Sequence, residues 1–243
     1  MTEPRMLLQG VSRSFRGGAG IHDIDLRVEP GQIHAIVGLN GAGKTTLMRV
    51  ALGMLRPDAG TVTLDGHALR AAPRDLWSRA GHLVEHPLAY GELTGRDNLL
   101  LAARLHGAGR RAPELVDAAI AEFGLEPYRS VRVRAMSLGN KHRVGLAAAL
   151  QHGAPIIVLD EPTNDLDPAG VIRLREALER RAAAGAGILV SSHHLDEVSR
   201  IADVITVINR GRVVGTLPPG GSELEQAFFD VIHRDDLATG VAA

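Results

Sequence analysis

The most informative segment of this sequence is Gly38-Leu39-Asn40-Gly41-Ala42-Gly43-Lys44-Thr45. It matches the pattern G-x-x-x-x-G-K-[ST], and it lies between the apolar run Ile33–Val37 and a helical pattern. Glycines here allow successive backbone N–H groups to turn inward around phosphate oxygens, and the following helix adds partial positive charge at its N-terminus. A glycine-rich turn with a chance lysine is the competing interpretation, which the correct flanks on both sides disfavour.

The stretch therefore predicts a nucleotide site. Lys44 is expected to reach the β- and γ-phosphates, and the Thr45 hydroxyl is expected to bind Mg²⁺. The residues expected to contact the nucleotide here are Gly38, Asn40, Gly41, Ala42, Gly43, Lys44, Thr45 and Thr46.

A second apolar run, Ile156–Leu159, ends in the acid pair Asp160 and Glu161. We expect Asp160 to hold Mg²⁺ through water. Glu161 is expected to polarise a water for attack on the γ-phosphate, a general-base role that contributes about 10²–10⁴ in rate. Two acids at a strand end can instead be simply solvated, but their combination with the phosphate loop favours the catalytic interpretation.

Composition restricts the other functions. The chain has 243 residues, 45% of them hydrophobic and 23% charged, which is typical of a globular protein. It has no cysteine, which excludes disulfides and thiolate metal sites. The net charge of −1 offers no general attraction to nucleic acid or to anionic lipid. We find no signal peptide and no apolar run near the ~20 residues that span a bilayer, so the chain is expected to be cytoplasmic.

Short apolar runs alternate with helical patterns, which predicts an α/β fold. Further strands are expected at Ala80–Val84, Gly187–Ser191 and Val204–Ile208, and the region of about 87–152 is expected to be a mostly helical insertion. Thr94 and Asp167 are predicted N-caps, because each precedes a helical pattern. A capping box beginning at Ser222 predicts a terminal amphipathic helix.

With these motifs in place, the chain resembles the ATP-binding subunit of an ABC transporter, over Leu7 to about Leu217. Met136-Ser137-Leu138-Gly139-Asn140 resembles the family's signature loop, commonly L-S-G-G-Q, which closes over the γ-phosphate bound to the opposite subunit of a dimer. Ser137 and Gly139 match the contacting positions, whereas Leu138 and Asn140 depart from the common pattern.

Two further loops resemble those of the family. Pro162–Asp167 resembles the D-loop, with Asp167 at the position of its acid, although the same residue is also a predicted helix N-cap. Ser191-Ser192-His193 resembles the segment of the switch histidine. By that resemblance, His193 donates a hydrogen bond to the γ-phosphate.

Two assignments rest on position alone. Phe15 precedes the phosphate loop at the spacing where the family stacks an aromatic on adenine; the competing interpretation is a strand residue of the core. Glu85 follows the Ala80–Val84 run, where most relatives carry the glutamine of the Q-loop. It can ligate Mg²⁺, or it can be an exposed acid at a strand end.

The departures from the common pattern resemble one branch of the family, the bacitracin-resistance and lantibiotic-immunity exporters. Glu85-His86-Pro87, Tyr90–Thr94 and the S-L-G-x-K signature fit that branch in outline.

The resemblance implies a P-loop NTPase (RecA-like) core with an N-terminal antiparallel β subdomain and an inserted α-helical subdomain. It implies an ABC-type domain over residues 1–219, with the helical insertion at about 87–152, and a C-terminal amphipathic helix and tail over residues 220–243. It further implies an ATPase that uses ATP and Mg²⁺, dimerises with itself when ATP binds, and drives an integral membrane permease from the inner face of the cell membrane.

Three other functions are open to a phosphate-loop protein. A non-transport ATPase of related architecture, acting on ribosomes or DNA, is disfavoured by the single phosphate loop, the lack of a heptad run and the lack of a basic patch. A simple P-loop kinase or GTPase has no use for the signature loop or for His193. The histidines are too scattered along the chain to predict a metal site.

Overall fold

The computed structural model describes residues 3–85, 89–220 and 223–240. Its centre is a six-stranded sheet in the order β10-β9-β3-β8-β7-β6, parallel except for β10, which pairs antiparallel with β9. These strands are β3 (Ile33–Val37), β6 (Ala80–Leu83), β7 (Ile156–Leu159), β8 (Gly187–Ser192), β9 (Val204–Asn209) and β10 (Arg212–Leu217).

A second, antiparallel sheet has the order β2-β1-β4-β5. Its strands are β1 (Met6–Ser14), β2 (Gly20–Val28), β4 (Ala59–Leu64) and β5 (His67–Ala68). The mixed α/β architecture, with an N-terminal antiparallel sheet beside a parallel core, confirms the predicted fold class.

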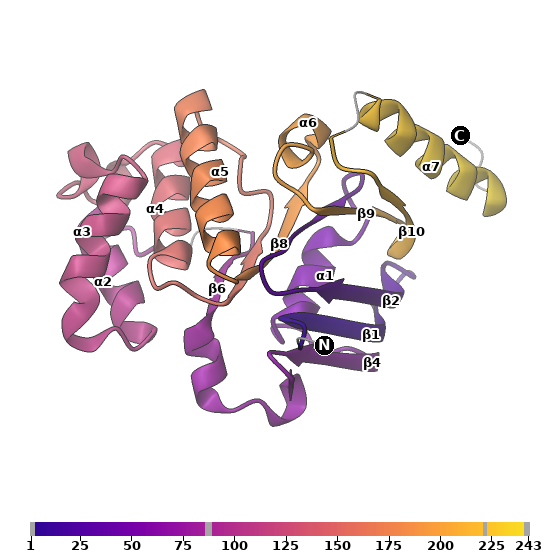
Figure 1. Ribbon diagram of the computed structural model, residues 1–243, viewed down its shortest axis with the longest axis horizontal. Helices are drawn as coiled ribbons and strands as arrows, with labels where there is room; N and C mark the ends of the chain where they lie inside the picture. The colour runs from indigo at the N-terminus through magenta and orange to yellow at the C-terminus, as the bar shows by residue number, and fades with distance from the viewer. Residues whose placement is uncertain (1–2, 86–88, 221–222, 241–243) are drawn as a thin grey trace.

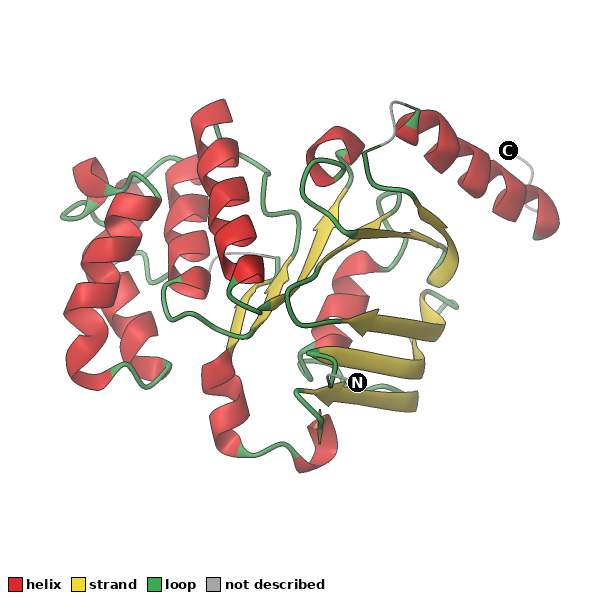
Figure 2. Ribbon diagram, in the orientation of Figure 1, coloured by secondary structure: helices red, strands yellow, loops and turns green. Residues whose placement is uncertain are grey.

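Figures 1 and 2 show how the helices lie around the two sheets. Helices α2–α4 lie on one side of the six-stranded sheet, and the antiparallel strands lie on the other (Figure 1). The helices are α1 (Lys44–Ala51), α2 (Gly95–Leu105), α3 (Ala112–Glu122), α4 (Leu138–Leu150), α5 (Pro168–Ala183), α6 (Leu195–Val198) and α7 (Leu224–Ala238). Short 3-10 helices cover Leu69–Ala71, Arg74–Arg79, Gly109–Arg111, Glu126–Tyr128 and Val133–Ala135.

The central strands are buried on both faces, as expected for parallel strands covered by helices. Along β3, Ile33, Ala35 and Val37 belong to a core shared with α2–α5, whereas Ile36 faces a second core with α1 and the antiparallel sheet. Successive side chains of a strand point to opposite faces, so one short run serves both cores. This position between two cores fixes the carboxyl end of β3, from which the phosphate loop leaves.

The predicted helix starts at Thr94 and Asp167 are confirmed. The Thr94 side chain accepts a hydrogen bond from the Asp97 N–H, and the Asp167 side chain accepts one from the Gly170 N–H. The helical pattern after the phosphate loop predicts a helix from about Lys44 to Met54, but α1 ends at Ala51, because Gly53 adopts a left-handed conformation with φ of 68°.

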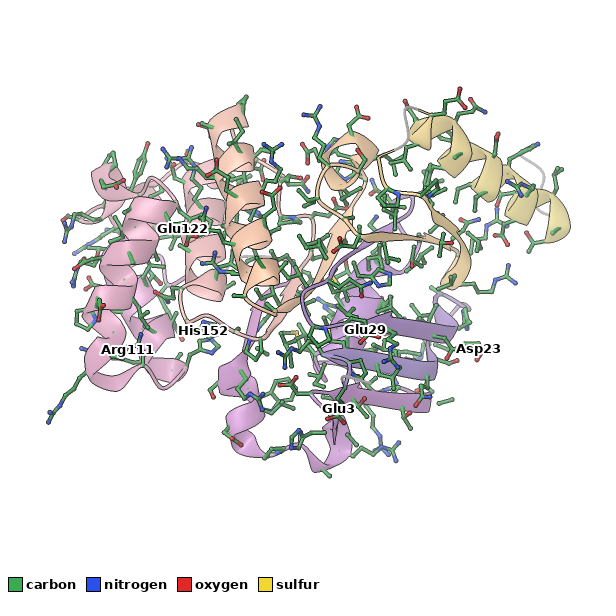
Figure 3. All side chains as sticks on the ribbon, in the orientation of Figure 1. Glu3, Asp23, Glu29, Arg111, Glu122 and His152 are labelled. Atoms are coloured by element: carbon green, nitrogen blue, oxygen red, sulfur yellow. The ribbon has the colours of Figure 1, made fainter. Side chains whose placement is uncertain are left out.

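An ion-pair cluster joins the helical region to the core helix α5. Glu122 of α3 accepts hydrogen bonds from both terminal nitrogens of Arg181, at 2.9 and 2.8 Å, and from Arg180 at 2.7 Å. Figure 3 labels Glu122 beside this junction. Burial of the Glu122 carboxyl raises its pKa, but the hydrogen bonds and charges of Arg181 and Arg180 outweigh burial and hold the pKa below its usual value.

Helix α7 has an apolar stripe, as its sequence pattern predicts. Leu224, Phe228 and Ile232 are buried in the core that contains β9 and β10. The predicted capping residue Ser222 lies outside the described residues, as do His86 and Pro87. In the described part of the chain, no helix is both long and apolar enough to cross a membrane.

Candidate nucleotide site

The phosphate loop connects β3 to α1. Gly41 and Gly43 have φ angles of 82° and 106°, in the left-handed region that favours glycine. Gly38 has no room for a side chain, since an added Cβ would lie 2.3 Å from the Ile208 carbonyl oxygen. Helix α1 begins at Lys44, so its first N–H groups face the loop. These features form a cradle of backbone donors of the kind that binds phosphate.

Lys44 is held within this cradle. Its side chain is 7% exposed, and Nζ donates a hydrogen bond to the Gly38 carbonyl oxygen at 2.8 Å. Nζ also lies 3.4 Å from Glu161 Oε1. The ammonium group is therefore directed across the loop toward the acid pair that follows β7.

Asp160 and Thr45 meet at the carboxyl edge of the sheet. Asp160 is buried, and its Oδ2 accepts a hydrogen bond of 2.7 Å from the Thr45 hydroxyl. A hydroxyl and a carboxylate are hard oxygen ligands, and Mg²⁺ is usually bound by one or two such groups together with substrate phosphates. The two side chains, which the sequence places 115 residues apart, thus fit the predicted magnesium site.

Glu161 lies between Lys44 and His193, the two side chains predicted to face the γ-phosphate. Oε2 is 2.7 Å from His193 Nδ1 and accepts a 3.2 Å hydrogen bond from the His193 N–H, while Oε1 faces Lys44. The backbone of Glu161 has a φ of 48°, a left-handed conformation that non-glycine residues seldom adopt. Residues held in such conformations cluster at functional sites.

The signature segment begins helix α4. Ser137 is its N-cap and accepts a hydrogen bond from the Asn140 N–H at 3.3 Å. Gly139 packs against the D-loop so closely that an added Cβ would lie 2.3 Å from the Asp165 carbonyl oxygen. Leu138, one of the two residues that depart from the family pattern, is 62% exposed. The described contacts of Ser137 and Gly139 are thus with their own helix and with the D-loop.

Asp167 has a structural role at the start of α5, as N-cap and as partner of Arg143, whose Nη2 lies 2.9 Å from its Oδ2. Its predicted contact with a nucleotide stays a prediction. A neighbouring contact also ties the D-loop to the signature helix, since His142 Nε2 lies 3.1 Å from the Pro162 carbonyl oxygen. Burial of the His142 ring lowers its pKa.

Phe15 follows β1 and is 39% exposed, so the competing assignment to the core does not hold. The guanidinium of Arg13 lies 5.3 Å from the centre of its ring. An exposed aromatic face of this kind suits stacking on adenine, which stays a prediction.

Glu85 forms an ion pair with Arg49 of α1 and is 45% exposed, with a φ of 67°. This placement matches the exposed acid at a strand end, and the described contacts of Glu85 do not include Thr45 or Asp160. Its Mg²⁺ ligation stays a prediction. No sequence pattern pointed to Arg49, because it contacts Glu85 only through the tertiary fold.

A cavity of about 500 Å³ opens beside the phosphate loop. Leu39, Asn40 and His193 line it, together with Phe228 and Phe229 of α7. The amphipathic pattern predicted α7 but gave no indication that the helix reaches this site. In the described residues, no group of three histidines or acids is arranged to hold a metal by itself.

The phosphate cradle, the hydroxyl–carboxylate pair and the acid beside Lys44 and His193 define a P-loop nucleoside triphosphatase. The family model described as "ABC transporter" matches residues 21–164. The chain belongs to the ABC transporter family, as an ATP-binding subunit and ATPase.

Curated relatives place it within the family. The daunorubicin resistance ATP-binding protein DrrA3 of Streptomyces coeruleorubidus is 35% identical, over 100% of this chain and 78% of that protein. The bacitracin transport ATP-binding protein BcrA of Enterococcus faecalis is 38% identical, over 85% and 67% of the two chains. The lantibiotic transport ATP-binding protein SrtF of Streptococcus pyogenes is 32% identical, over 93% and 96%. These similarities confirm the resemblance to the bacitracin and lantibiotic branch.

Solved structures agree on the fold. One described as the structure of an ATP-binding subunit of an ABC transporter has a TM-score of 0.85 and 28% identity, covering 93% of this chain and 99% of that one. A dimeric post-hydrolysis cassette bound to ADP and phosphate has a TM-score of 0.81 and 21% identity, covering 89% and 99%.

Proposed function

We propose that this subunit dimerises around two ATP molecules, hydrolyses them, and thereby drives a separate membrane permease that exports a drug or an antimicrobial peptide. The observation that carries the proposal is the position of Glu161, whose carboxylate contacts both Lys44 and His193. Those are the two side chains expected to hold the γ-phosphate, so Glu161 is within reach of the water that attacks it.

The roles within one site follow from this arrangement. The phosphate loop and Lys44 bind the β- and γ-phosphates, and Thr45 and Asp160 hold Mg²⁺. Bound Mg²⁺ would neutralise charge that develops on the phosphate oxygens. When phosphate takes over the contacts with Lys44 and His193, the Glu161 carboxylate is released to accept a proton from water.

The site needs a second copy of the chain to be complete. Ser137 and Gly139 lie at the N-terminus of α4, where backbone N–H groups and the helix dipole favour an anion. Their described contacts within the chain do not include the phosphate loop. We therefore assign them to the γ-phosphate bound by a partner copy, so that ATP favours the closed dimer and hydrolysis favours the open one.

The transport role draws on the relatives. The three named relatives carry drug resistance, bacitracin transport and lantibiotic transport in their names, and none of these concerns ribosomes or DNA. From these names we infer that the permease exports a drug or an antimicrobial peptide and so confers self-resistance. The chain would then act in the cytoplasm, on the inner face of the membrane, where its permease binds it.

The proposal is tested by co-expressing the chain with a candidate permease in a sensitive bacterium. Parental subunit is expected to raise the tolerated concentration of bacitracin, a lantibiotic or daunorubicin, and Glu161→Gln is expected to abolish that gain. Equal protection by both would contradict a role for ATP hydrolysis. A lack of protection by an actively hydrolysing parent would contradict export of these compounds.

A further inference from the structure

Ser191 is the buried hydroxyl that links the metal-binding acid to the catalytic acid. It lies next to the end of β8, is 0% exposed, and contacts two consecutive residues of the neighbouring strand's end. Its Oγ donates a hydrogen bond to Asp160 Oδ1 at 2.5 Å and accepts one from the Glu161 N–H at 2.8 Å. No sequence motif assigns a role to this serine.

Strand register explains the contact. In the parallel pair of β7 and β8, Leu159 is opposite Val190, so Asp160 and Ser191 follow side by side at the same edge of the sheet. The sequence separates them by 31 residues. The pairing of the two strands therefore holds the Ser191 hydroxyl beside the Asp160 carboxylate.

The two bonds of Ser191 act on different groups. Asp160 uses its other oxygen, Oδ2, to accept from Thr45, the residue expected to bind Mg²⁺. The bond from Ser191 to Oδ1 therefore fixes the rotation of the carboxylate and directs Oδ2 toward the metal side. The bond to the Glu161 N–H satisfies a backbone donor in a residue whose φ of 48° is unfavourable without such support.

We propose that Ser191 is a positioning residue for ATP hydrolysis: its hydroxyl orients the Asp160 carboxylate for Mg²⁺ and holds the backbone of Glu161 in its catalytic conformation. This inference rests on the proposed function, because it assigns Mg²⁺ to Asp160 and the base role to Glu161. It predicts that loss of the hydroxyl weakens the use of Mg²⁺ and slows hydrolysis, while nucleotide binding by the phosphate loop is retained.

The structure offers a matched pair of substitutions. An apolar cavity of about 180 Å³ is lined by Ser191 together with Pro162, Val171 and Val190, which provides room for an added methyl group. Ser191→Thr keeps the hydroxyl, and Ser191→Val has nearly the same shape without it. Comparison of the two isolates the hydrogen bonds from any effect of packing. Ser191→Ala supplies the simple deletion.

Ser192 supplies the neighbouring control. It is 2% exposed, and its hydroxyl contacts the backbone of His194, accepting from the N–H at 2.9 Å. Ser192→Ala removes a buried hydroxyl from the same strand end but leaves Asp160 untouched. It is expected to keep the parental Mg²⁺ dependence.

The first readout does not require turnover. In the Glu161→Gln background, thermal stabilisation is measured at fixed ATP while Mg²⁺ is varied, with ATP plus EDTA as the metal-free reference. Ser191→Ala and Ser191→Val are expected to raise the Mg²⁺ concentration for half-maximal stabilisation about tenfold, the loss expected from one hydrogen bond to a charged group. Ser191→Thr is expected to stay within about threefold of the parent, as a conservative hydroxyl replacement that keeps that bond.

The second readout is steady-state hydrolysis with Glu161 present. Ser191→Val is expected to lower kcat about tenfold or more relative to Ser191→Thr, by the same loss of a charged hydrogen bond, with KM for ATP changed little. Equal kcat and equal Mg²⁺ dependence of the Thr and Val variants would overturn the proposal. Failure of the parent itself to hydrolyse ATP would instead contradict the proposed function, so the two failures are distinguishable.

Discussion

A stacked pair of histidines is expected to make the stability of the protein depend on pH. The rings of His106, at the end of α2, and His152, just after α4, have centroids 3.8 Å apart and lie within 13° of parallel. Figure 3 labels His152 below α4. Both ring nitrogens of His152 are buried without a hydrogen-bond partner in the described structure. A proton added to the His152 ring would therefore have no hydrogen-bond acceptor among the described residues.

Burial lowers the pKa of His152 from 6.5 to about 3, and the charges of His106, His82 and Arg181 add to that effect. Burial also lowers the pKa of His82 and of His106. Each of these groups disfavours the imidazolium form. The carboxylate of Glu122 is itself paired with Arg181 from α5.

The sign follows from proton linkage. The unfolded chain binds a proton at His152 below about pH 6.5, whereas the folded chain stays neutral there until about pH 3. The stability that neutral His152 contributes is thus fully present above pH 6.5. It is lost progressively as the pH falls from about 6.5 to about 3. From about pH 7.5 to about pH 5.5 the loss is ~1.4 kcal/mol, which corresponds to roughly 3 to 6 °C in Tm for a domain of this size.

The assay is thermal unfolding at a series of pH values, for the parent and for His152→Leu. The leucine variant cannot titrate at this site, so its Tm is expected to fall by roughly 3 to 6 °C less than the parental Tm over the same pH range. His233→Leu, an exposed position on α7, is the control. If Tm falls equally with pH in the parent and in His152→Leu, His152 does not contribute to the pH dependence, whatever the absolute stability of the variant.

Three further predictions concern the nucleotide site. Ser137→Arg places a large side chain at the N-terminus of α4 and is expected to block ATP-dependent dimerisation while the monomer still binds ATP; unchanged light scattering would contradict the shared site. Phe15→Ala is expected to weaken ATP binding about tenfold, as loss of one base-stacking contact would, whereas Phe15→Tyr is expected to bind ATP about as tightly as the parent. Equal ATP affinities of the two variants would contradict stacking of Phe15 on adenine. The predicted ligation of Mg²⁺ by Glu85 implies that Glu85→Gln lowers ATPase activity and raises the Mg²⁺ concentration that the reaction requires. An unchanged rate and Mg²⁺ dependence would leave Glu85 with only its ion pair to Arg49.

Local patterns made much of the fold predictable. The runs Ile33–Val37 and Ile156–Leu159 become strands with the expected bounds, because a short continuous apolar run between turn residues suits a strand buried on both faces. The caps at Thr94 and Asp167 depend on residues three positions away, which a sequence displays directly. Helix α1 ended early because backbone conformation at Gly53 overrides the apolar periodicity.

Contacts between distant segments were less predictable. The motifs predicted that Asp160 and Thr45 both serve a Mg²⁺ site, but no local pattern indicated that Ser191 would bond to Asp160 or that Arg49 would pair with Glu85. These contacts arise from strand register and helix packing, and neither is encoded by a local pattern. The approach of α7 to the phosphate loop has the same origin.

The central claim is that Glu161 is the catalytic base of an ATPase that closes as a dimer around ATP. The most direct measurement combines ATP turnover with light scattering on Glu161→Gln. We expect this variant to bind ATP normally, to turn it over at least about 10²-fold more slowly, as loss of a general base would cause, and to form a stable dimer only with ATP. Parental turnover by this variant, or a monomer that persists at saturating ATP and Mg²⁺, would contradict this claim.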